Sequence, residues 1–201
     1  MIFILNRVHT DSIHFQFEAV YKNQKISYAP FKSDQSKSFK SDDAFVAINT
    51  DAKTDKEVTR VLQGVFGFGE NNGHIYYTGD ENASCFNGMY YWNFELVNKT
   101  YTVYEVCLGR KGIYLCVYDG DELIAQISKN TKTKHNNNQY EIFSKVADLN
   151  LLSCICIFWD MLHYPPDSIH DFGKMNAWNR ALREKFDVDF IKDVKNNFYG
   201  V

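Results

Sequence analysis

Apolar and polar positions alternate over most of the first 145 residues, and this period of two predicts β-strands. Aromatic and β-branched residues occupy the repeating positions, as in SIHFQFEAV, where Ile13, Phe15 and Phe17 share one face. Eight further segments with this pattern follow in the chain: AFVAIN, EVTRVLQGVFGF, HIYYTG, MYYWNFELV, YTVYEVCLG, GIYLCVYDG, ELIAQISK and QYEIFSK. We therefore expect a sheet of about nine strands from residue 12 to residue 145.

The connections between these segments are short and carry turn residues. They read ENNG, GDEN, VNKT, GRKG and YDGD, and Asp119-Gly120 is the strongest signal for a two-residue hairpin. Connections this short join antiparallel neighbours, because a parallel crossover needs a dozen or more residues. Gly64, inside a predicted strand, predicts a β-bulge. The segment 30–43 is polar and rich in Ser and Lys, and it predicts an exposed loop.

The pattern changes to that of a helix from about Val146. The run LNLLSCICIFWDML (Leu149–Leu162) is apolar nearly all round, so we expect the sheet to enclose it. Pro165-Pro166 marks its end. A second helix, GKMNAWNRALREKF, is amphipathic and belongs on a surface, and DVDFIKDVKNNF suggests a further short helix. The apolar stripe of the second helix consists of Met175, Trp178, Leu182 and Phe186.

These patterns predict a mainly β protein with some α structure. An antiparallel, barrel-like meander wraps around the hydrophobic helix Leu149–Leu162, and a terminal amphipathic helix lies on its surface. Residues 1–164 form the barrel with its central helix, and residues 165–201 form a helical extension packed on it. The 201 residues include 16 Phe, 13 Tyr and 3 Trp. Rings in such numbers indicate a filled aromatic interior rather than an open cavity.

Charge and cysteine content narrow the function class. A net charge of -3 argues against nucleic acid as a partner, because such proteins carry a basic excess. No apolar run reaches the length of a transmembrane helix. The cysteines are odd in number and no leader pattern precedes them, so we expect reduced thiols in the cytoplasm. They are Cys85, Cys107, Cys116, Cys154 and Cys156.

Residues 92–164 resemble the second half of a known fold. The segments that carry the resemblance are FELVNKTYTVYEVCLGRKGIYLCVYDGDELIAQISKNT and NNNQYEIFSKVADLNLLSCICIFWDMLHYP. They are similar to the tubby C-terminal-like family, which includes the LURP-one-related proteins of plants. The resemblance implies strands curved around a single hydrophobic helix. It also implies a non-enzymatic module that binds phosphoinositide headgroups through basic side chains on its outer wall.

Basic residues in two predicted loops are the candidates for a phosphate-binding patch. They are Arg110 and Lys111 in one turn, and Lys129, Lys132 and Lys134 in the loop KNTKTKH. Together they would attract an anionic phospholipid headgroup. Exposed lysines that serve solubility alone would produce the same pattern. The module could instead bind a protein partner on its outer surface, for instance on the apolar stripe that includes Trp178.

An enzyme is the alternative class, for example a hydrolase with a pocket that the sequence hides. A nucleophilic site could consist of the Cys154 or Cys156 thiol, an imidazole from His163 or His170, and the Asp160 carboxylate to orient it. Thiols in so apolar a stretch, however, are expected to be inert. A metal site would use Asp160, His163, His170 and Asp171, whose spacing fits no recognised pattern. We expect an exposed or interfacial set there instead, and we predict no catalytic residue, metal or cofactor.

Two further groups have structural explanations. Gly64, Gly67, Gly69 and Gly73 do not match the spacing of a dinucleotide-binding loop, and a bulge and a hairpin explain them. Asp119, Asp121 and Glu122 belong to a hairpin tip. An enzyme should show a concave polar pocket with perturbed titratable groups, whereas a binding module should show a filled interior.

Overall fold

The protein is a closed barrel of twelve antiparallel strands, seen in a computed structural model that describes residues 1–10, 14–32, 37–49, 60–79, 90–108, 112–129, 139–163 and 180–199. Each strand pairs with its neighbours in the chain, and β1 closes the ring by pairing with β12. The strands are β1 (Ile2–His9), β2 (Phe15–Tyr21), β3 (Gln24–Pro30), β4 (Lys37–Lys40), β5 (Ala44–Ile48), β6 (Arg60–Phe68), β7 (Asn71–Gly79), β8 (Tyr90–Leu96), β9 (Lys99–Cys107), β10 (Ile113–Asp119), β11 (Glu122–Lys129) and β12 (Gln139–Ser144).

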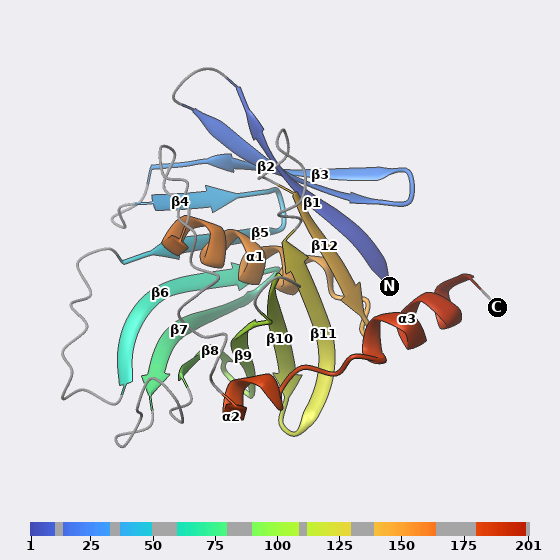
Figure 1. Cartoon of the computed structure of the whole chain (residues 1–201). Coiled ribbons are helices and arrows are strands. Elements are labelled where there is room, and N and C mark those ends of the chain that lie inside the picture. The colour runs from blue at the N-terminus through green and yellow to red at the C-terminus, as the bar shows by residue number, and fades with distance from the viewer. Residues whose placement is uncertain are drawn as a thin grey trace.

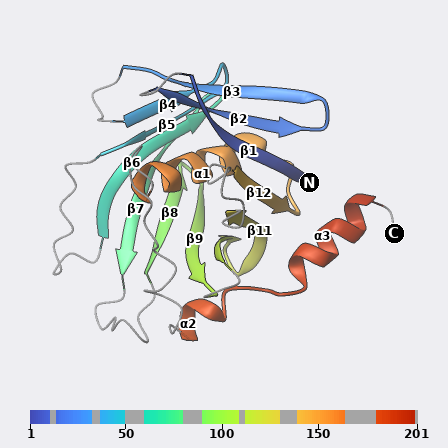
Figure 2. The same cartoon turned by 45° about the horizontal axis from the view of Figure 1, so that its top comes forward.

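The hydrophobic helix α1 (Leu149–His163) lies inside this ring of strands (Figures 1 and 2). Every residue from 151 to 161 is buried. Asp148 caps the helix, since its carboxylate accepts a 3.0 Å bond from the Leu151 amide. The expected architecture, a sheet wrapped around Leu149–Leu162, is therefore confirmed.

Aromatic side chains fill the space between the helix and the strands. One hydrophobic core joins residues of all twelve strands to α1. Phe94 packs edge-on against both Phe66 and Phe158, with ring centroids 5.2 and 5.4 Å apart. Other rings face outward, such as Tyr91 and Tyr104, which pack against each other on neighbouring strands. The aromatic content thus serves both the interior and the outer wall.

Three strands were not among the nine expected. β4 lies inside the segment 30–43 that the sequence predicts as an exposed loop, and this prediction is wrong for residues 37–40. Phe39 is buried and packs against Phe17, while the polarity of the segment comes from its other positions. β1 and β3 complete the ring at the N-terminal side.

Two local predictions concern glycines. The bulge at Gly64 is confirmed, because the pairing of β6 with β7 shifts register between Leu62 and Gly64. A Cβ atom at Gly64 would lie 2.4 Å from the Ala47 carbonyl oxygen, so the close approach of β5 requires glycine. The β10–β11 hairpin has the two-residue loop Gly120-Asp121, one residue later than expected, and Gly120 has a φ of 59°.

Residues 180–199, here called the C-terminal strap, run along the outside of the barrel (Figure 1). The strap contains α2 (Arg180–Arg183) and α3 (Phe190–Tyr199). Phe186 packs on Tyr114 of β10, with ring centroids 4.7 Å apart, and Phe190 of α3 is buried against Phe143 of β12. Within the described residues, the extension therefore packs on the barrel, and the short helix expected near the end of the chain is present as α3.

The second predicted helix is shorter at its C-terminal side than expected. The sequence extends it to Phe186, but α2 ends at Arg183. The barrel offers other partners to the carbonyls that follow: the Tyr118 hydroxyl donates to the Lys185 carbonyl, and the Gln126 side-chain amide donates to that of Asp187, both over 2.9 Å. These bonds hold the chain that follows α2 against β10 and β11. Residues 164–179, including Trp178 and Pro165-Pro166, lie outside the described residues.

Candidate functional site

A cluster of charged side chains lies inside the barrel near the C-terminal end of α1. Arg7 of β1 donates to Asp160 of α1 over 3.1 Å, and the Lys129 ammonium lies 3.8 Å from the same carboxylate. The Tyr140 hydroxyl donates to the other carboxylate oxygen of Asp160. Both carboxylate oxygens thus have donors from the barrel wall.

A second acidic residue extends this interior charge cluster. The Trp159 indole N–H donates to Glu105 of β9 over 2.8 Å. The Lys129 ammonium lies 5.2 Å from the centre of the Tyr140 ring, and the Arg7 guanidinium lies 3.9 Å from that of Phe15. We define the interior charge cluster as Arg7, Glu105, Lys129, Tyr140, Trp159 and Asp160.

Burial shifts the pKa values of Lys129 and Asp160 in this cluster. It lowers the pKa of Lys129 to about 8, although Asp160 opposes the shift. It also raises the pKa of Asp160, and the charges of Arg7 and Lys129 counteract this rise. Because a guanidinium stays protonated in proteins, Arg7 provides a permanent counter-charge for the Asp160 carboxylate. Because Arg7 and Lys129 share the Asp160 carboxylate of α1, and Trp159 of α1 donates to Glu105 of β9, the cluster is suited to joining α1 to the barrel wall rather than to proton transfer with a substrate.

The position of Asp160 corrects one expectation. The sequence placed it in an exposed or interfacial set at the end of the helix, but its side chain is completely buried. His163 ends α1, and nothing of its side chain is described; His170 and Asp171 lie outside the described residues. Over the described ranges, no three His, Cys, Asp or Glu side chains gather in a way that could hold a metal ion.

The helix cysteines are buried, as predicted from the apolar stretch around them. Cys154 and Cys156 are fully buried and unbonded to each other. Burial raises the pKa of both thiols, and the Asp160 carboxylate raises that of Cys156 further. The Cys154 thiol donates to the Phe45 carbonyl over 3.5 Å. Neither residue has the thiolate character that a nucleophile needs.

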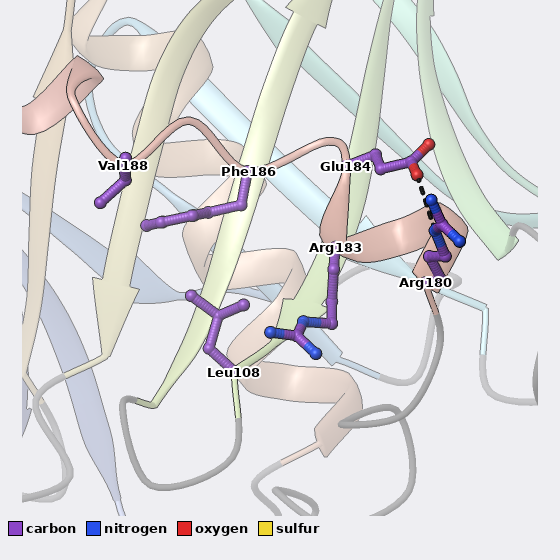
Figure 3. Close-up of a pocket in the computed structure, with 6 residues that line it drawn as sticks. All are labelled: Leu108, Arg180, Arg183, Glu184, Phe186 and Val188. Atoms are coloured by element: carbon purple, nitrogen blue, oxygen red, sulfur yellow. Dashed lines mark hydrogen bonds and ion pairs between the residues drawn. The ribbon is translucent and has the colours of Figure 1, made fainter.

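A pocket of about 390 Å³ opens on the outer wall, between the strap and the end of β9 (Figure 3). Its lining residues are Leu108, Arg180, Arg183, Glu184, Phe186 and Val188. In Figure 3 the Arg183 side chain extends from α2 toward Leu108, whereas Arg180 and Glu184 face each other and form an ion pair of 3.2 Å. The pocket therefore combines one cation directed toward the barrel with an apolar side.

The predicted phosphate patch is only partly placed by the structure. Lys129 does not lie in an exposed loop; it ends β11, its side chain is 4 % exposed, and it points to Asp160. A lysine in the last inward position of a strand looks, in the sequence, like the first residue of a polar loop. Arg110, Lys111, Lys132 and Lys134 lie outside the described residues. In the sequence, Leu108 of the pocket wall directly precedes the segment GRKG that contains Arg110 and Lys111.

Sequence reasoning singled out Lys129 and Asp160 but missed their grouping with Arg7 and Glu105, and it missed the outer pocket. Arg7 and Glu105 are charged residues in strands whose apolar and polar positions alternate. A charged residue in such a strand normally points to the outer face, and only the strand register shows that these two point inward. Arg180 and Arg183 lie opposite the apolar stripe of the second predicted helix, where the pattern indicates a solvated face. The two basic residues of the strap could have been noted as an i, i+3 pair, but the sequence contains no signal that places Leu108 beside them.

The remaining groups have structural roles. Gly64, Gly67, Gly69 and Gly73 belong to the β6–β7 hairpin. Asp119 forms an ion pair of 2.7 Å with Lys99. No helix in the described ranges is long and apolar enough to cross a membrane.

The chain was compared with protein-family models, with curated proteins and with solved structures, and it matches none of them. The fold and the site therefore define the class by themselves: a closed twelve-stranded barrel that encloses a hydrophobic helix and carries a pocket on its outer wall.

Proposed function

We propose that this protein is a non-enzymatic, tubby-like or LURP-one-like binding module of the cytoplasm that engages its ligand through its outer surface. The observation that carries the proposal is the filled interior. The core joins every strand to α1, so the place where many barrels hold a substrate is occupied by the chain itself. The cavity described above opens instead on the outer wall.

The titratable groups support a binding role over catalysis. The groups with strongly shifted pKa values are buried, in the interior as Cys154 and Lys129 are, or beneath the strap on β10 as Cys116 and Tyr118 are. None of these side chains lines the outer pocket. An enzyme site normally brings perturbed groups and a concave surface together. Here the two are separate, which disfavours the alternative of a hydrolase with a pocket hidden in the sequence.

The ligand we propose is an anionic phospholipid headgroup. Four of the five basic residues identified in the sequence remain candidates: Arg110, Lys111, Lys132 and Lys134. Lys129 leaves the set, because its ammonium pairs with Asp160 inside the barrel. A protein partner is the second candidate, favoured by the half-apolar character of the pocket beside Leu108.

Sedimentation with vesicles tests the lipid ligand. We expect the protein to bind phosphatidylcholine vesicles that contain a phosphoinositide, and to bind pure phosphatidylcholine poorly. Substituting glutamine for Arg110, Lys111, Lys132 and Lys134 together should abolish the difference. The matched control is Lys192→Gln, which removes an exposed charge from α3. Equal sedimentation with both vesicles, or an unchanged quadruple variant, would contradict the lipid proposal.

A further inference from the structure

The outer pocket joins two parts of the chain that are far apart in sequence. Leu108 directly follows β9, and the other lining residues come from positions 180–188 of the strap. Its volume of about 390 Å³ is within the range of sites for small ligands or single side chains. Because one wall belongs to the barrel and the other to the strap, the pocket exists only while the strap is docked.

The charge in this pocket comes from Arg183. The neighbouring acid, Glu184, accepts from Arg180. Among the described residues, the Arg183 side chain takes part in no ion pair or hydrogen bond, and it is exposed. A guanidinium directed into a pocket and not paired with a carboxylate of the chain is a ready donor for an anion, and its planar fork matches a carboxylate.

The opposite side of the pocket is apolar. Phe186 holds its ring against Tyr114, and Leu108 and Val188 complete the wall. Val188 is 73 % exposed, which is high for an apolar residue beside a pocket. An exposed apolar surface next to a charge is typical of a site for a ligand that carries both characters. A polyphosphate would bind more tightly to several converging cations than to one guanidinium next to an aromatic ring.

We propose that this pocket binds the C-terminal residue of a partner protein, with its carboxylate on Arg183 and an apolar side chain on Phe186 and Leu108. A C-terminal residue carries the anion and the apolar group on the same Cα, which suits a pocket that offers both within so small a volume. The inference rests on the proposed binding role of the outer wall, but not on the lipid as its ligand.

Titration of the full chain with N-acetyl-leucine, followed by amide resonances in NMR, tests the proposal. We expect saturable shifts at Leu108 and at residues 183–188. The comparison probe is N-acetyl-leucine amide, which lacks the carboxylate, and it should bind about tenfold more weakly, as should the variant Arg183→Gln with the acid. Lys192→Gln is the charge-matched control and should bind like the wild type.

Besides the absence of any response to N-acetyl-leucine, three results would overturn the proposal. They are equal binding of the acid and the amide, inorganic phosphate binding as tightly as N-acetyl-leucine, and shifts that Arg183→Gln leaves unchanged. The vesicle experiment separates this proposal from the lipid one. Vesicle binding without any response to N-acetyl-leucine would overturn the pocket proposal and leave the lipid proposal intact. A response to N-acetyl-leucine without vesicle binding would do the opposite.

Discussion

Arg7 in the first strand and Asp160 in the enclosed helix form an ion pair of 3.1 Å, although 153 residues separate them in the chain. The pair is nearly inaccessible to solvent, with exposed side-chain fractions of 4 % and 0 %. It links the strand that closes the barrel to the helix that fills it.

Replacing the acid of this pair should destabilise the protein strongly. In Asp160→Asn, the Arg7 and Lys129 charges stay buried without their carboxylate, so we expect a loss of about 3–5 kcal/mol in the free energy of unfolding. Urea denaturation measures it. The matched control is Asp119→Asn, which breaks the exposed pair with Lys99 and should cost about 1 kcal/mol or less. Equal losses in the two variants would contradict a structural role for the interior charge cluster.

Stability should depend on pH through Lys129. Its pKa is about 8 in the folded protein, below the ordinary 10.5. Between these values the unfolded chain binds more protons at this side chain than the folded chain, so the contribution of Lys129 to stability rises with pH. Relative to Lys129→Met, the wild type should gain up to about 1.4 kcal/mol per pH unit in this window.

The comparison with the variant is necessary because buried thiols act in the opposite direction. Burial raises the pKa of Cys116 and Cys154, so their contribution is lost as the pH rises above about 9. These thiols are present in both the wild type and Lys129→Met, so their contributions cancel in the difference between the two free energies of unfolding. Denaturation curves from pH about 8 to pH about 10 give the result. A difference that does not change with pH would show that the ammonium of Lys129 is not held in a desolvated site.

Gly73 should tolerate no side chain. A Cβ atom there would lie 2.3 Å from the Glu95 carbonyl oxygen and 2.7 Å from the Phe66 ring. Gly73→Ala should therefore cost about 3 kcal/mol, the upper end for overpacking. Gly69→Ala is the control: Gly69 has a φ of 57° but open space around it, so the strain should cost only about 1 kcal/mol. Thermal unfolding of both variants measures whether Gly73→Ala lowers the stability more than Gly69→Ala does.

The strap should detach without unfolding the barrel when its apolar contact is removed. Phe190 is buried against Phe143, in a small core that is separate from the main one. We expect Phe190→Ala to speed amide hydrogen exchange in residues 180–199 while the strands keep their protection. Phe198→Ala, on the exposed side of α3, is the control and should leave exchange unchanged. Faster exchange in α1 as well would mean that strap and barrel unfold together.

The sequence was sufficient to predict the architecture because the decisive signal is a contrast of periods. Alternation to about residue 145, followed by an apolar helix that includes Cys154 and Trp159, leaves few folds other than a sheet around a helix. β4 was missed because its four residues contain one apolar ring, Phe39, and the neighbouring lysines dominate the composition.

The chemistry inside the barrel was much less predictable. Whether Lys129 points into the core or into solvent depends on where β11 ends, which is the least certain part of any prediction from periodicity. Glu105 lies at an inward position between Val103 and Cys107. Its hydrogen bond from the Trp159 indole N–H depends on the orientation of α1 about its own axis, which the sequence does not specify. The outer pocket depends on the docking of the strap, which no local pattern encodes.

The order of the elements has a consequence for synthesis on the ribosome. The strand that completes the ring, β12, and the helix that fills it, α1, are made after all the other strands, and β1 must wait for both. At typical rates of about 5–20 residues per second, the first strand spends roughly 7 to 27 seconds without its final partner. Its exposed edge and the empty apolar concavity are then open to chaperones, and nascent chains that stop before Leu149 should require them.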